Sequence, residues 1–150
     1  MLKDKFQEEL KEAMLSKDTL KTSVIRMLLS AVNYYEIQKG VDYKATDDDV
    51  LIIIQKEVKK HQESIDQFKN AKREDLVEKE EKEQEILKAY LPLQMEDSEL
   101  KKIVEEALSQ TSASSLKDLG KVMAIVMPKV KGKADGGRVS SLIKEFLSKT

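Results

Sequence analysis

Apolar residues recur three or four positions apart along most of this chain, which is the spacing of one face of an α-helix. The first two stretches with this pattern are separated by a short polar segment, residues 16–19. They predict a helical hairpin that ends near Gly40. The apolar positions are Leu2, Phe6, Leu10, Ala13 and Met14 in the first helix, and Leu20, Val24, Met27, Leu28, Ala31 and Tyr35 in the second.

A third helix is predicted to begin after Thr46. This threonine precedes three aspartates, a pattern that favours a helix N-terminus because the hydroxyl accepts a backbone N–H and the acids stabilise the first turn. The helix carries an apolar seam nearly three heptads long, which indicates packing against another helix. The seam consists of Leu51, Ile54, Val58, His61, Ile65 and Phe68.

The next predicted helix runs from Asp75 to Lys88 and is almost wholly charged in its middle. We expect it to project into solvent, supported by pairs such as Glu78 with Lys82 four residues apart. Pro92 closes this region, and we place a domain boundary there. The predicted domains are 1–92, an N-terminal helical domain, and 93–150, a C-terminal domain.

Three short helices are predicted in the C-terminal domain, with caps at Asp97 or Ser98, Ser114 or Ser115, and Asp135. The second of them should stop at Pro128, because proline has no backbone N–H and disfavours helical geometry at the residue before it. The whole pattern predicts an all-α protein, with an N-terminal hairpin or bundle of about four helices followed by a small three-helix domain.

Composition agrees with this fold class. Two prolines and five glycines leave few residues for the turns of an all-β fold. No apolar run approaches the length of a membrane span, and the N-terminus shows neither a signal-peptide core nor a transit-peptide bias, so we expect a cytoplasmic protein with no membrane partner. The absence of cysteine excludes disulfides, thiolate chemistry and cysteine-type zinc sites.

No motif in the sequence specifies an active site. His61 is the only histidine, and its position on the apolar seam favours a packing role over that of a general base. Metalloprotease and P-loop motifs are missing. Glu80 and Glu81 lie on a face that we expect to be solvated. We therefore expect no catalytic residue, no metal and no cofactor.

Positive charge gathers near the end of the chain. Residues 111–150 contain eight Lys or Arg and three Asp or Glu, although the formal net charge of the chain is −1. Lys129, Lys131 and Lys133 lie between two predicted helices, and we call residues 129–138 the basic elbow. Lysines beside a helix N-terminus can form a phosphate-binding surface. A solvated connector is the more common meaning of such a charge run.

Aromatic residues do not alternate with these lysines, so stacking of single-stranded bases is unsupported. An anionic partner would be held through its phosphates and its shape, as expected for structured RNA.

The run GKVMAIVMPKVKGKADG, residues 120–136, closely resembles the signature of the bacterial YqeY-like family, and the match extends over essentially the whole chain. Further matching stretches are residues 24–28, residues 74–76, and residues 90–92 before Gln94. That family is similar to the C-terminal tail of the B subunit of the glutamine-dependent aspartyl/glutamyl-tRNA amidotransferase. In the enzyme, this helical region contacts the tRNA away from the chemistry.

The resemblance implies a tRNA-directed role for the basic elbow. The residues it assigns to RNA binding are Lys129, Lys131, Gly132, Lys133, Gly136, Gly137 and Arg138, the glycines giving backbone access. It does not imply catalysis, because the parts of the amidotransferase that produce ammonia and activate tRNA are not in this chain. Family labels nevertheless associate it with carbon–nitrogen ligase activity with glutamine as the amido-N-donor.

Three hypotheses follow for the function. The first is a non-catalytic tRNA-binding accessory module. The second is a helical adaptor that docks a partner protein through the apolar seam and the charged helix of the N-terminal domain. The third is an enzyme that acts on aminoacyl-tRNA, for which the sequence supplies no catalytic constellation.

Overall fold

The structure, a computed structural model, describes residues 1–148. These residues form seven α-helices, one short 3-10 helix and no strand, which confirms the predicted all-α class. The chain divides into two compact units, Met1–Leu91 and Pro92–Thr150, and each has a hydrophobic core of its own. Within the described range, no helix combines the length and the apolar character that crossing a membrane requires.

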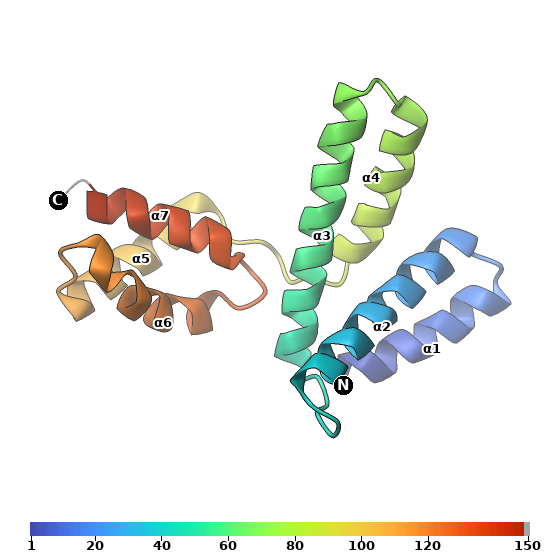
Figure 1. The fold of residues 1–150 in the computed structure, drawn as a ribbon, viewed down its shortest axis with the longest axis horizontal. Helices are drawn as coiled ribbons and strands as arrows, with labels where there is room; N and C mark the ends of the chain where they lie inside the picture. Colours follow the sequence, from blue (N-terminus) through green and yellow to red (C-terminus); the bar gives the residue numbers. More distant parts are fainter. Residues whose placement is uncertain (149–150) are drawn as a thin grey trace. The chain divides into compact units, whose positions relative to one another are not determined.

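The first unit consists of two helical hairpins (Figure 1). Its helices are α1 (Leu2–Leu15), α2 (Thr19–Lys39), α3 (Asp47–Asn70) and α4 (Glu74–Lys88). The α1–α2 and α3–α4 turns are alike, since Lys17 and Lys72 both adopt left-handed φ angles, of 59° and 58°. In the second turn, the N–H of Arg73 then donates to the carbonyl of Phe68 at 2.9 Å. A single left-handed residue thus reverses the chain in each hairpin.

The core of the first unit contains four of the predicted apolar positions, Phe6, Val24, Leu28 and Ile54, together with apolar residues that the pattern does not single out. Phe6 of α1 packs edge-on against the ring of Tyr90, with ring centroids 4.8 Å apart. Burial raises the pKa of the Tyr90 phenol, and a hydrogen bond to Glu9 raises it further. The buried residues of this core are Phe6, Val24, Ile25, Leu28, Val32, Ala45, Val50, Ile53, Ile54 and Leu87.

The predicted N-terminus of α3 is confirmed as a capping box. The Thr46 hydroxyl accepts the N–H of Asp49 at 3.1 Å, and the Asp49 carboxylate accepts the N–H of Thr46 at 3.0 Å. The hydroxyl of Tyr43 also donates to Asp49, at 2.6 Å. This bond is the main reason that the pKa of Asp49 is lowered to about 2 and that of Tyr43 raised to about 12.

The charged helix α4 does not stand alone in solvent as we expected, because it packs along α3 through one face. Gln84 and Leu87 are buried on that face, and the Gln84 amide donates to the carbonyl of Val58 at 3.1 Å. The predicted pair of Glu78 with Lys82 is present at 3.0 Å on the solvated side. A few buried positions at helical spacing are therefore enough to anchor a mostly charged helix.

The second unit contains α5 (Asp97–Thr111), the 3-10 helix η1 (Leu116–Asp118), α6 (Leu119–Val130) and α7 (Gly136–Ser148). Helices α5, α6 and α7 pack against one another around one core (Figure 1). Helix α7 contributes Val139, Ile143 and Leu147 to this core. The other buried members are Met95, Leu100, Val104, Ala107, Val122, Val126, Val130 and Ala134.

Candidate nucleic-acid interface

The basic elbow begins inside a helix, because α6 continues through Pro128 to Val130. The prediction that the helix stops at Pro128 is wrong. A proline in the last turn removes only one intrahelical hydrogen bond, the one to the carbonyl of Ala124. Ala124 and Pro128 are both exposed, where water can solvate that carbonyl, whereas Val130 is fully buried and ties the last turn to the core.

Beyond the helix, inward and outward positions of the basic elbow alternate. Val130, Gly132 and Ala134 are buried, whereas Lys131 and Lys133 are exposed, as is Lys129 in the last turn of α6. The N–H groups of Lys133 and Ala134 both donate to the carbonyl of Val130, at 2.8 and 3.1 Å. The backbone thus forms a compact turn that holds the lysine side chains on the surface.

Gly132 is needed for the path of this turn. Its φ angle is +75°, in the left-handed region that glycine adopts at little cost and other residues avoid. Gly132 is buried, and its carbonyl accepts a hydrogen bond from the Gln94 side chain at 2.9 Å. A role for its backbone in RNA binding stays a prediction.

Met95, the residue after Gln94, also forms a hydrogen bond with the basic elbow. The N–H of Met95 donates to the carbonyl of Lys133 at 2.9 Å, and the Met95 side chain is 9% exposed in the core. The sequence pattern predicts only a domain boundary at Pro92 and does not indicate that Gln94 and Met95 are held against the basic elbow. Apolar character alone does not signal this packing, because the nearby Leu93 is also apolar but is 92% exposed.

Helix α7 starts where the sequence predicts, with Asp135 as its cap. One Asp135 carboxylate oxygen accepts the N–H of Arg138 at 2.8 Å, and its backbone carbonyl accepts the N–H of Val139 at 3.1 Å. The first N–H groups of a helix have no intrahelical acceptor, so those of Gly136 and Gly137 point out of its N-terminal end. Gly137 is exposed and Gly136 partly so.

Arg138 forms an ion pair within the second unit. Its Nη2 atom lies 2.6 Å from a carboxylate oxygen of Asp97, at the start of α5. The guanidinium lowers the pKa of Asp97 by hydrogen bonding and by charge. A phosphate would therefore have to compete with Asp97 for Arg138.

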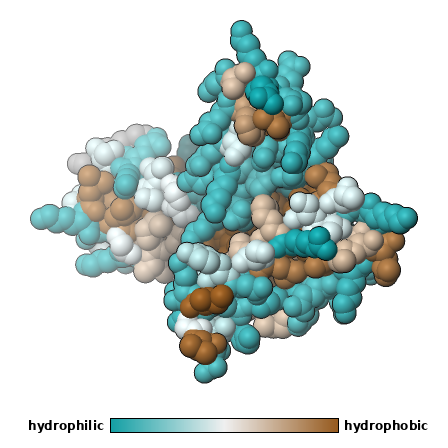
Figure 2. Space-filling view, turned by 45° about the vertical axis from the view of Figure 1, so that its right-hand side comes forward, coloured by the Kyte–Doolittle hydropathy of each residue, from teal (hydrophilic) through white to brown (hydrophobic). Residues whose placement is uncertain are grey.

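The apolar seam of α3, which the adaptor hypothesis uses for docking, is covered within the first unit. Ile54, His61 and Ile65 are buried, and Leu51, Val58 and Phe68 are partly buried. Figure 2 shows a face that is mostly hydrophilic, with apolar residues in several separate groups. On this face, no broad apolar surface replaces the seam as a docking site.

A family model described as "Yqey-like protein" matches residues 3–147. Relatives called "Altered inheritance of mitochondria protein 41, mitochondrial" occur in Pyrenophora tritici-repentis, 36% identical over 95% of this chain and 79% of the relative, and in Lachancea thermotolerans, 30% identical over 96% and 80%. An uncharacterized protein of Schizosaccharomyces pombe is 35% identical over 57% of this chain and 68% of its own length.

The names of the first two relatives assign those proteins to mitochondria. They do not support the cytoplasmic location that we expected for this chain, which stays a prediction. None of the three names states a ligand or a reaction.

Proposed function

This chain belongs to the YqeY-like family, and on that basis we propose that it is a non-catalytic accessory module that binds tRNA through the basic elbow. The observation that carries the proposal is the display of Lys129, Lys131 and Lys133, all exposed, on a backbone fixed by a compact turn. The similarity of the family to the tail of a tRNA-dependent amidotransferase supplies the class of ligand.

The ordered backbone favours binding because its conformational entropy has already been lost on folding. A flexible lysine loop would have to be ordered at the moment of association, which weakens affinity. Here Gln94 and Met95 hold the carbonyls of Gly132 and Lys133 in the free protein. The backbone that carries the three lysines is therefore already ordered before a phosphate binds.

Recognition in this proposal rests on phosphates rather than on bases. The elbow contains no aromatic side chain on which a base could stack. Lysine ammonium groups neutralise phosphates and release counterions, and the outward N–H groups of Gly136 and Gly137 favour an anion at the start of α7. Such a surface suits the closely spaced backbones of a folded RNA.

The proposal is tested by fluorescence anisotropy of labelled total tRNA with the wild-type chain and with Lys129, Lys131 and Lys133 changed together to alanine. We expect the triple variant to bind at least about tenfold more weakly, because up to three phosphate contacts are lost. The matched control changes Lys102, Lys117 and Lys144 to alanine, which removes the same charge from exposed positions of the same unit.

The control should stay within about twofold of the wild type, since no local cluster of charge is removed. Equal weakening by both triple variants would contradict the proposal, because it would indicate attraction to the unit as a whole. Wild-type binding that neither variant changes would place the RNA on another surface.

A further inference from the structure

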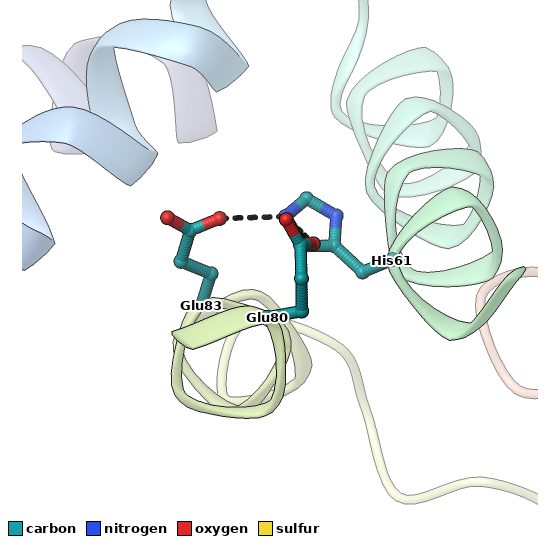
Figure 3. Close-up of side chains that lie close together, drawn as sticks. All are labelled: His61, Glu80 and Glu83. Atoms are coloured by element: carbon teal, nitrogen blue, oxygen red, sulfur yellow. Dashed lines mark hydrogen bonds and ion pairs between the residues drawn. The ribbon is translucent and has the colours of Figure 1, made fainter. Parts of the chain in front are cut away.

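The first unit contains a cluster of one histidine and two glutamates that the proposed function does not use. His61 of α3 is 6% exposed, and its ring faces Glu80 and Glu83, which lie three residues apart on α4. Figure 3 shows both carboxylates directed at the imidazole from the neighbouring helix. The His61 Nε2 atom lies 3.2 Å from an oxygen of Glu83 and 3.6 Å from an oxygen of Glu80.

The other ring nitrogen of His61 fixes what Nε2 can do. Nδ1 lies 2.9 Å from the backbone carbonyl of Glu57, one turn earlier in α3, and a carbonyl can only accept a hydrogen bond. Nδ1 therefore carries a hydrogen. In the neutral ring, Nε2 then carries a lone pair and can only accept a hydrogen bond. The two carboxylate oxygens that it faces are hydrogen-bond acceptors too. The short contact with Glu83 therefore requires either a hydrogen on Nε2 or a cation between the three groups.

A single proton on Nε2 balances this charge incompletely. It gives an imidazolium that donates to Glu83, while the second carboxylate remains in excess. Among the described residues, no lysine or arginine forms an ion pair with Glu80 or Glu83, whose side chains are 22% and 14% exposed. The nearby Glu57 is paired with Lys60 at 3.2 Å. A divalent cation balances both carboxylates and leaves the ring neutral.

We propose that His61, Glu80 and Glu83 bind a zinc ion, with water as the fourth ligand. Zinc takes imidazole nitrogen and carboxylate oxygen at about 2.0–2.2 Å, so two ligand atoms at the tetrahedral angle lie about 3.4 Å apart. The distances of 3.2 and 3.6 Å from Nε2 bracket that value. The bond from Nδ1 to a backbone carbonyl is the outer contact that zinc-binding histidines usually make.

The choice of zinc follows from the donor atoms. Calcium and magnesium prefer ligand sets made wholly of oxygen, whereas an imidazole with two carboxylates suits a borderline metal. The sequence pattern predicts no metal here, because it places Glu80 and Glu81 on a solvated face. The packing of α4 on α3 turns one edge of that face toward His61.

The experiment is calorimetric titration of Zn²⁺ into the full chain without an affinity tag, after removal of bound metal with a chelator. The protein has one histidine and no cysteine, so no other imidazole or thiolate competes. We expect one ion per chain and at least about tenfold weaker binding for Glu83→Gln and for Glu80→Gln. The matched control is Glu78→Gln, the same change on the same helix at a side chain that is 70% exposed.

A second readout is the ¹⁵N NMR spectrum of the single imidazole. Zinc should shift Nε2 while Nδ1 keeps its hydrogen, and this signal is independent of the stability of the variants. Zinc binding that Glu78→Gln weakens as much as Glu83→Gln would overturn the proposal, since it would show only general attraction to an acidic helix. An imidazole spectrum that zinc leaves unchanged would overturn it as well.

Discussion

The left-handed turn at Gly132 offers a direct test of how the basic elbow is held in place. Gly132→Ala forces an L-residue into a φ angle of +75°. That conformation costs about 1–2 kcal/mol. The lower entropy of the unfolded alanine chain offsets about 0.4–1 kcal/mol of this cost. We expect a net loss of about 1 kcal/mol in the free energy of unfolding.

The assay is thermal unfolding followed by far-UV circular dichroism. In a unit of about 60 residues, a change of about 1 kcal/mol moves Tm by about 4–8 °C, so Gly132→Ala should lower Tm by that amount. The matched control is Gly120→Ala in the first turn of α6, where an added Cβ meets nothing within 4 Å. It should raise the stability by about 0.5 kcal/mol, because alanine favours a helix.

The change from glycine to alanine should therefore lower the free energy of unfolding at position 132 and raise it at position 120. If Gly132→Ala were neutral or stabilising, the turn would not depend on the left-handed residue, and the argument for a fixed lysine display would fail. If both variants were destabilised alike, the loss would reflect something other than the φ angle.

Two further predictions concern carboxylates. Asp97→Asn should strengthen tRNA binding by about two- to fivefold in the anisotropy assay, because it releases Arg138 from a competing charge; unchanged or weaker binding would show that Arg138 is not a contact. For Asp49, the Tyr43 hydroxyl is the main reason that the pKa in the folded protein, about 2, lies below the usual value of 3.8. The contribution of Asp49 to stability is therefore present above about pH 4 and is lost as the pH falls toward 2. Urea unfolding of wild type and Asp49→Asn should therefore differ near pH 6 and converge near pH 2, and a difference independent of pH would contradict this assignment.

The features that were predicted correctly depend on residues close together in sequence. The capping box at Thr46 spans four residues, and the spacing of apolar positions indicates part of the buried face of the helices. Such patterns can be recognised within a few turns of a single helix. The end of α6 could not be predicted in this way. The helix continues past Pro128 to Val130, which is buried in the core formed with other helices.

The candidate sites depend on residues far apart in sequence, which explains what was missed. Asp97 and Arg138 are 41 residues apart, and no periodicity links them. His61 and Glu83 could have been paired from the sequence, since each lies 11 residues from Lys72 at the turn of the α3–α4 hairpin. That inference requires knowing that the charged helix folds back along α3, and its polarity indicated the opposite.

The most direct test of the account measures how the affinity for tRNA changes with salt. Each phosphate neutralised by a lysine contributes roughly 0.7–0.9 to the slope of log affinity against log salt concentration. Replacing Lys129, Lys131 and Lys133 with alanine should therefore make the slope smaller by about 2–3, while the control with Lys102, Lys117 and Lys144 changed keeps the wild-type slope. Equal slopes for the wild type and the elbow variant would contradict the claim that tRNA is held by the basic elbow.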